Sequence, residues 1–240
     1  HYGPRRSQSP HSRVRRAGEN VMLVAFDFGV IGRNLPYLWE GMQLSLLLTG
    51  LSACGSIVLG TILALMRLSG IKLFQWIGAV WVNFFRSLPL LLVIFWFYFL
   101  VPVVVQQQVD AFQSALIGFV LFEAAYYCEI MRSGILSISR GQAWAGYALG
   151  LRYSQTMRYI VLPQAFRNML PILLTQTIIL FQDTSLVFVV GLADFMTSAV
   201  NVAQRDSRLI ELYVFAAFVY LVMCYFGSLY VKHLQQKMHR

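Results

Sequence analysis

Three carboxylates lie inside long apolar runs of the sequence, where an acidic side chain is unusual. They are Glu123, Glu129 and Asp183. An ionised carboxylate at the centre of a bilayer costs about 2.5 to 3.5 kcal/mol on insertion scales, so water, an ion partner or hydrogen bonds must offset it. Each therefore marks either a polar pathway or a packing contact between helices.

The position of each acid in its run separates these two roles. Glu123 falls near the middle of its run, so both roles stay open for it. Glu129 stands three residues before Arg132, close to the predicted cytoplasmic end of the same run, which favours a position near the membrane interface or a hydrogen bond made for packing. Asp183 is one of four consecutive polar residues, and four in a row encircle a helix, so some of them must face protein or water. We predict a pathway or inter-helix role for that group, which comprises Gln182, Asp183, Thr184 and Ser185.

One arginine could also bind an anion in this region. Arg86 directly precedes Ser87-Leu88-Pro89 and a long uncharged run. The favoured interpretation is that it anchors a helix end by extending its guanidinium to the membrane surface. The alternative is an anion ligand in the pathway.

A basic connection at residues 136–165 is the second candidate site. Residues 141–150 are mostly small and end in Gly150, which suits the left-handed conformation that terminates a helix. Residues 153–161 can form a second short helix, and Pro163 fits the first turn of the next one. We predict two short helices that project into the cytoplasm as an interaction surface. The alternative is an amphipathic helix lying on anionic lipid.

The elements that position these groups belong to an all-α integral membrane protein. Of 240 residues, 58% are hydrophobic and 12% are charged, and the net charge is +9. A soluble domain has roughly 25% charged residues. Apolar runs long enough to cross a bilayer predict five transmembrane helices, at about residues 41–66, 87–109, 111–131, 168–191 and 212–231. A partial helix at residues 72–85 makes six the alternative.

The distribution of bases predicts the orientation. Between Glu129 and Asp183 all charges are arginines, whereas the next connection mixes acids and bases. The positive-inside rule then places the basic connection and the C-terminus in the cytoplasm. Five arginines within residues 1–21 break this rule, so we expect that segment to be a non-native or disordered extension.

Several enzyme classes lack support in the sequence. It contains no Gly-Lys dipeptide for a phosphate-binding loop and no zinc-protease or serine-hydrolase motif. The histidines lie near the two ends and the cysteines occur singly. We therefore expect no catalytic residues, no metal site, no cofactor bound by this chain and no nucleic-acid partner.

The basic connection resembles the cytoplasmic signature of permease subunits of binding-protein-dependent ABC importers. That signature is a Glu-Ala-Ala triplet, three residues, Gly, nine residues, Ile, one residue and Leu-Pro. Gly150, Ile160, Leu162 and Pro163 match at this spacing, whereas Trp144-Ala145-Gly146 replaces the triplet. A literal Glu123-Ala124-Ala125 lies upstream, but Glu129 stands where the glycine should be, so we assign that segment to a membrane span.

Further motifs resemble the polar amino acid subclass, and most closely its glutamate/aspartate permeases. They are Phe85-Arg86-Ser87-Leu88-Pro89, Phe122-Glu123-Ala124-Ala125-Tyr126-Tyr127, Ser139-Arg140-Gly141-Gln142 and Leu180-Phe181-Gln182-Asp183-Thr184-Ser185-Leu186. The resemblance implies a type I importer permease fold over residues 22–240, in a bacterial inner membrane. It also implies three kinds of protein partner: a pair of ATPase subunits that bind ATP and Mg²⁺, a second permease, expected to be a different chain, and a periplasmic amino-acid-binding protein.

The resemblance also implies roles for particular residues. The ATPase would contact the short cytoplasmic helices, a set that comprises Gly141, Gln142, Trp144, Ala145, Gly146, Gly150, Ile160, Leu162 and Pro163. The substrate pathway would include Arg86, Glu123, Gln182, Asp183, Thr184 and Ser185.

Two other functions stay open. One is a permease for another polar amino acid such as glutamine. The other is a self-sufficient secondary transporter, which would need inverted repeats that five unequal spans do not show.

Overall fold

The computed structural model describes residues 27–107 and 109–238, and this part of the chain is built from helices. The predicted extension at residues 1–21 lies outside the described residues. In chain order the elements are α2 (Gly29–Leu68), α3 (Lys72–Arg86), α4 (Leu90–Phe95), η1 (Trp96–Leu100), α5 (Val101–Val105), α6 (Ala111–Leu136), α7 (Arg140–Ala148), α8 (Tyr153–Thr156), η2 (Met157–Val161), α9 (Leu162–Asp183), η3 (Thr184–Val190), α10 (Phe195–Arg205) and α11 (Leu209–Met238).

Within the described ranges, four helical segments are long and apolar enough to cross a bilayer. They are α2, α6, the continuous segment Tyr153–Val190 and α11. A fifth candidate is a bent pair, Lys72–Arg86 with Leu90–Val104, whose halves meet at 101°. The predicted number of five therefore agrees with the upper count, and the sixth helix is the first half of this pair.

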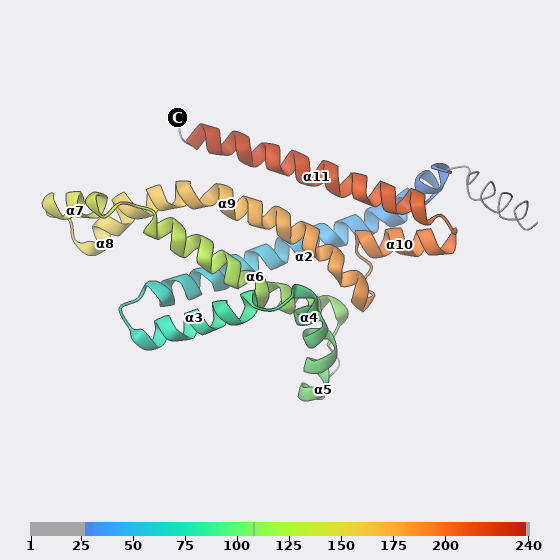
Figure 1. The fold of residues 1–240 in the computed structure, drawn as a ribbon, viewed down its shortest axis with the longest axis horizontal. Coiled ribbons are helices and arrows are strands. Elements are labelled where there is room, and N and C mark those ends of the chain that lie inside the picture. The colour runs from blue at the N-terminus through green and yellow to red at the C-terminus, as the bar shows by residue number, and fades with distance from the viewer. Residues whose placement is uncertain (1–26, 108, 239–240) are drawn as a thin grey trace, which may run out of the picture.

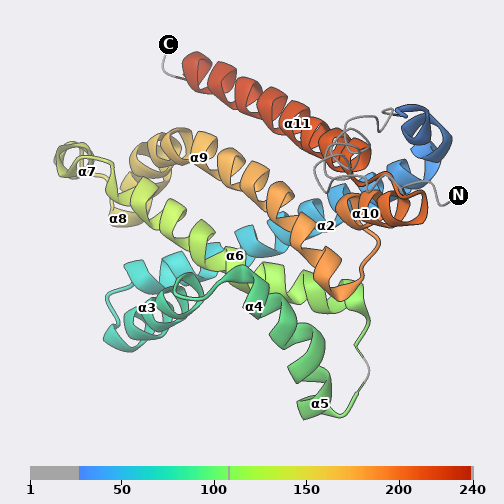
Figure 2. The same cartoon turned by 45° about the vertical axis from the view of Figure 1, so that its right-hand side comes forward.

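The second span is bent where it begins. The uncharged run at residues 87–109 holds the contiguous helical elements α4, η1 and α5, as the predicted position of this span requires, but they follow α3 only after a sharp bend that the sequence did not predict. Pro89 limits the residue before it to extended conformations, so the chain cannot stay helical there. Figures 1 and 2 show α4 and α5 leaving the body of the protein at a steep angle.

Small residues allow α2 to pack closely on α6, the most extensive helix contact in the described part of the chain. At Gly60 an added Cβ would lie 2.9 Å from the Tyr127 Cβ and 3.0 Å from the Ala124 carbonyl oxygen. Ser56, one turn earlier, donates to the Val120 carbonyl at 3.3 Å. Such interfaces are typical of membrane helices, where close van der Waals packing must replace the hydrophobic effect.

A buried aspartate fixes the start of α10 against α2. The Asp194 carboxylate accepts from the backbone N–H groups of Met196 at 3.1 Å and Thr197 at 2.9 Å, which caps the helix. The N–H of Phe195, the residue directly after Asp194, donates to the Ser45 hydroxyl of α2 at 3.0 Å. Burial raises the pKa of Asp194, although these hydrogen bonds oppose the shift.

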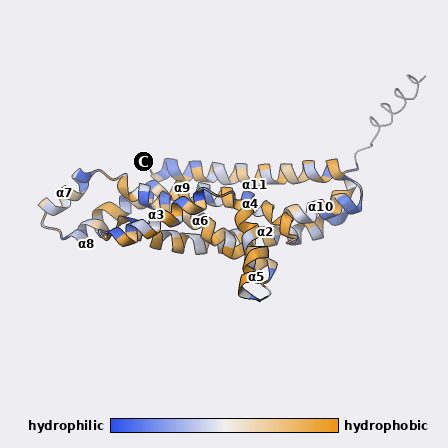
Figure 3. Ribbon diagram, turned by 60° about the horizontal axis from the view of Figure 1, so that its bottom comes forward, coloured by the Kyte–Doolittle hydropathy of each residue, from blue (hydrophilic) through white to orange (hydrophobic). Residues whose placement is uncertain are grey.

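The outer surface of the long helices is apolar. Phe218, Leu221 and Phe226 of α11 are each more than half exposed, as expected for side chains that face lipid. Figure 3 shows α11 as mainly hydrophobic along its length, with hydrophilic residues gathered at its C-terminal end.

The two ends of the molecule differ in what they carry. Figures 1 and 2 place α7, α8 and the C-terminal end of α11 at one end, and α10 with the beginning of α2 at the other. This arrangement is compatible with the predicted topology, in which the basic connection and the C-terminus share one side of the membrane.

Candidate functional site: an exposed helical hairpin and an intramembrane polar cluster

The basic connection forms two short helices, as the sequence predicted. α7 ends in a Schellman motif, in which the Leu151 N–H donates to the Gly146 carbonyl at 3.1 Å and the Gly150 N–H donates to the Tyr147 carbonyl at 2.9 Å. Gly150 has φ +78°, the left-handed conformation expected from its position. The motif closes α7 and turns the chain back into α8.

Close packing holds α7 against the returning helix. Gly146 is the buried residue of α7, and a Cβ added there would lie 2.8 Å from Ile160 Cδ1 and 2.9 Å from Thr156 Cγ2. Gly146, which stands in place of the last alanine of the triplet, therefore meets Ile160 of the signature across the hairpin. Beyond Ile160 the helix continues without a break through Leu162 and Pro163, so Pro163 lies in the first turn of α9 after the π-helical segment η2.

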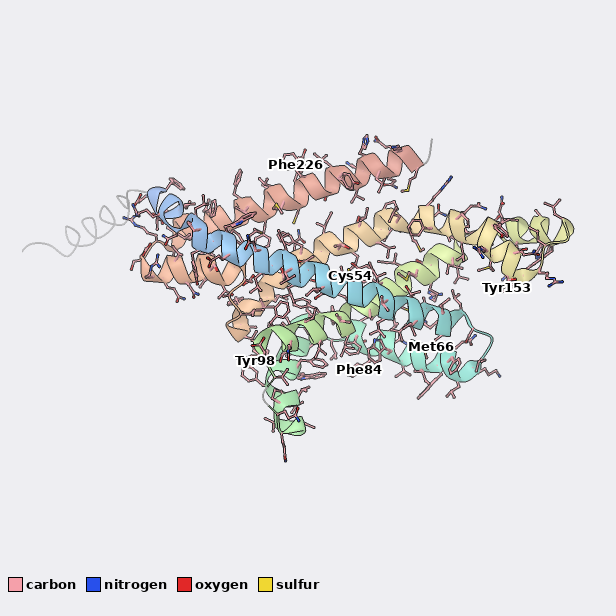
Figure 4. The ribbon with its side chains drawn as sticks, turned by 180° about the vertical axis from the view of Figure 1, so that it is seen from behind. Cys54, Met66, Phe84, Tyr98, Tyr153 and Phe226 are labelled. Atoms are coloured by element: carbon pink, nitrogen blue, oxygen red, sulfur yellow. The ribbon has the colours of Figure 1, made fainter. Side chains whose placement is uncertain are left out.

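The hairpin exposes a group of large apolar side chains. The exposed fractions are 69% for Trp144, 79% for Leu149 and 68% for Tyr153, and Figure 4 shows Tyr153 at the extreme end of the molecule. Gly141, Gln142 and Ala145 are exposed beside them. A concentration of apolar surface on a protruding element indicates a protein interface. We call residues 140–163 the coupling hairpin.

A second polar group lies between α6 and α9. The Glu123 side chain is almost fully buried and accepts a hydrogen bond from Gln176 Nε2 at 2.9 Å. The structure therefore gives Glu123 a hydrogen-bond partner on α9, Gln176, which the sequence did not reveal as part of the site. Gln176 precedes Asp183 by seven residues, or two helical turns on one face, and that spacing could have revealed it.

The other residues of the polar run point in different directions. Gln182 is exposed in a groove of about 500 Å³ that Tyr220 and Tyr225 of α11 also line. Thr184 is buried and donates to the Phe181 carbonyl at 2.8 Å, whereas Ser185 is half-buried. The α-helix ends at Asp183, and a 3-10 helix, η3, continues the same candidate span to Val190.

Arg86 lies at the bend between α3 and α4, close to α6. Its guanidinium carbon is 5.5 Å from the centre of the Tyr126 ring, and Nη1 is 3.8 Å from Glu129 Oε1. Glu129 also pairs with Arg132 at 2.8 Å and with Arg67 of α2, and the sequence predicted neither of these ion pairs. The Glu123-Ala124-Ala125 triplet is buried in the middle of α6, as expected for a membrane span.

Two further expectations concern absent features. Among the described residues, no group of three or more His, Cys, Asp or Glu side chains could hold a metal ion. The three cysteines, Cys54, Cys128 and Cys224, are free thiols. The prediction that this chain binds no cofactor stays a prediction.

The helical fold, the candidate spans and the coupling hairpin together define a membrane permease of the ABC importer type. Residues 56–240 match the family described as binding-protein-dependent transport system inner membrane component, and the chain belongs to this family.

Particular relatives narrow the comparison. The chain is 46% identical over 219 residues to the glutamate/aspartate import permease protein GltK of Escherichia coli O6:H1, a match that covers 88% of this chain and 98% of that protein. It is 34% identical to the probable glutamine ABC transporter permease protein GlnM of Bacillus subtilis, over 86% of this chain and 95% of that one. A crystal structure of an amino acid ABC transporter with histidines matches with a TM-score of 0.85 and 28% identity, covering 89% of this chain and 100% of the other.

Proposed function

We propose that this chain is a permease subunit of an ATP-driven importer for glutamate and aspartate. The observation that supports this most directly is the coupling hairpin, which carries the family signature and exposes Trp144, Leu149 and Tyr153 where a partner can contact them. The 46% identity to a glutamate/aspartate permease supports the substrate class.

In this proposal the chain performs no chemical reaction itself. ATP and Mg²⁺ bind to a separate pair of ATPase subunits, and the coupling hairpin fits a groove on one of them. A periplasmic binding protein delivers the amino acid to a pathway between this chain and a second permease. The chain spans a bacterial inner membrane with its C-terminus in the cytoplasm, which agrees with the positive-inside rule and with the hairpin lying at the same end as that terminus.

In this proposal the substrate pathway runs past the α3–α4 bend and past the polar residues Glu123 and Asp183. Irregular backbone is tolerated at membrane depth only where it is buried in protein or lines an aqueous cavity. Arg86, Ser87 and Pro89 at the bend are exposed, so this surface faces water or the second permease rather than lipid.

The charges of the pathway residues indicate how the substrate is oriented. Glutamate and aspartate carry two carboxylates and one ammonium group, so Glu123 and Asp183 alone would repel them. The ammonium group of the substrate therefore contacts Glu123 and Asp183, and Arg86 or a base of the second permease contacts its carboxylates. Gln182, Thr184 and Ser185 belong to the same stretch of the pathway, on α9 and η3.

Transport by the reconstituted complex tests this proposal. We expect the complex of this chain with its companion permease and ATPase to take up glutamate and aspartate when binding protein and ATP are supplied, and Asp183→Asn to reduce that uptake. Full uptake by Asp183→Asn would remove Asp183 from the pathway. Stimulation of ATP hydrolysis by glutamine instead of glutamate would favour the other polar amino acid class, and uptake by this chain alone without ATP would favour a secondary transporter.

A further inference from the structure

One carboxylate of α6 connects three helices at their ends. Glu129 pairs with Arg67, the penultimate residue of α2, with Arg86, the last residue of α3, and with Arg132 on α6 itself. The Glu129 side chain is 21% exposed, and three guanidiniums surround it. We call these four residues the arginine–glutamate cluster.

The three ion pairs differ in strength. Arg132 donates through Nε at 3.0 Å and Nη2 at 2.8 Å to one oxygen, Oε2. Arg67 hydrogen-bonds the other oxygen, Oε1, through Nη1. Arg86 reaches that same oxygen only at 3.8 Å, beyond hydrogen-bonding distance, and its side chain is 47% exposed. The contact with Arg86 is therefore the one that can break while the other two persist.

The carboxylate also counters repulsion among the bases. Three positive charges converge on one negative charge, and like charges in a partly buried position repel strongly once their counter-charge is removed. Without the Glu129 charge, the ends of α2 and α3 would be pushed away from α6.

The cluster lies between the two functional regions. Glu129 is seven residues before the end of α6, or about 10 Å along the helix, and the coupling hairpin starts four residues after that end. On the opposite side, Arg86 is directly followed by the α3–α4 bend of the broken span. A displacement of the hairpin that moves α6 would thus move Glu129 relative to the bend.

We propose that Glu129 is a positioning residue that transmits motion of the coupling hairpin to the α3–α4 bend, with its pairing to Arg86 made and broken during the transport cycle. This inference rests on the proposed function, because it needs an ATPase that moves the hairpin. It does not depend on which amino acid the pathway carries.

The test compares transport with ATP use in the same preparation. The full complex is reconstituted in proteoliposomes with its binding protein, and amino acid uptake is divided by ATP hydrolysed. For Glu129→Gln we expect this ratio to fall by about fivefold or more, the lower range of a typical coupling free energy, while ATP hydrolysis continues. Glu129→Asp keeps the charge on a side chain that is too short to reach all three guanidiniums, so its ratio should lie between those of Glu129→Gln and the wild type.

A matched control separates this effect from loss of any acid. Glu40 of α2 is exposed and forms no ion pair with the described residues, so Glu40→Gln should leave the ratio unchanged. A Glu129→Gln complex with the wild-type ratio would overturn the inference, and so would equal losses of uptake and ATP hydrolysis, which indicate a merely structural role. If Glu129→Gln does not assemble, the Glu129→Asp complex decides: a lowered ratio supports the inference and an unchanged ratio overturns it.

The controls also distinguish the two proposals. If neither the wild-type complex nor Glu40→Gln imports an amino acid with ATP, the proposed function is wrong. If both import and the Glu129 variants match them in uptake per ATP, only the transmission role is wrong.

Discussion

Three glycines of the coupling hairpin should respond differently to the same added methyl group. At Gly146 the new Cβ would lie 2.8 Å from Ile160 Cδ1 and 2.9 Å from Thr156 Cγ2, whereas carbon atoms pack favourably at about 3.5 to 4.0 Å. At Gly150 there is open space, but φ is +78°. At Gly141 the nearest atom is 3.9 Å away and the backbone is helical.

The expected magnitudes follow from these surroundings. Overpacking at Gly146→Ala costs about 1 to 3 kcal/mol, of which alanine's better helix propensity returns up to about 1 kcal/mol. Gly150→Ala costs about 1 to 2 kcal/mol from the left-handed conformation, partly offset by the stiffer unfolded chain. Gly141→Ala gains up to about 1 kcal/mol from helix propensity. Gly146→Ala and Gly150→Ala should therefore destabilise the hairpin, and Gly141→Ala should stabilise it.

Amide hydrogen exchange in the purified complex measures this directly. The informative amides are those of Gly150 and Leu151, which close the end of α7. A loss of about 1 kcal/mol in local stability should speed their exchange roughly fivefold. The two destabilising causes separate by rescue. Ile160→Val removes the contact with Ile160 Cδ1 and leaves the one with Thr156, so it should rescue Gly146→Ala only in part, whereas Gly150→Asn tolerates the left-handed backbone better than alanine.

An unchanged exchange rate in Gly146→Ala would refute the packing argument. In that case α7 is not held by close contact with the returning helix.

The remaining predictions concern packing, capping and pH. Gly60→Ala places a Cβ against Tyr127 and the α6 backbone, so it should lower the free energy of unfolding by about 1 to 3 kcal/mol, whereas Gly50→Ala in open space on the same helix should not; equal thermal midpoints would contradict this. Asp194→Ala removes the cap of α10 and should lower the free energy of unfolding by about 1 kcal/mol, as measured by chemical denaturation. Asp194→Asn should keep most of this stability, because asparagine also caps helices. A hydrogen bond from its arginine neighbour lowers the pKa of Asp206, so its stabilisation is present above pH 3.8 and is lost as the pH falls through the lowered value; the difference in thermal midpoint between wild type and Asp206→Asn should therefore disappear in acid.

Much of the fold followed from local patterns in the sequence. Apolar runs located α2, α6, α9 and α11, because a bilayer demands about 20 apolar residues whatever their order. Gly150 and Pro163 located the end of one short helix and the beginning of the next, since each restricts the backbone by its own covalent structure.

The features that the sequence did not predict depend mostly on contacts between distant segments. The bend between α3 and α4 was not predicted, because hydropathy does not record where a helix bends. Arg67 and Glu129 are 62 residues apart, and only the packing of α2 against α6 brings them together. Gln176 was overlooked because a single amide in an apolar run gains its meaning from Glu123 on a neighbouring helix.

The unbroken helical path from Tyr153 to Val190 fixes an angular phase between the coupling hairpin and the acid at residue 183. Each residue of an α-helix turns the chain by about 100°, so inserting one alanine between them would swing Asp183 away from Glu123, whereas inserting seven would return it nearly to its starting direction. Those seven residues would also move Asp183 by about 10 Å along the helix axis. The number of residues in this segment therefore fixes both the direction and the depth of Asp183 relative to the coupling hairpin.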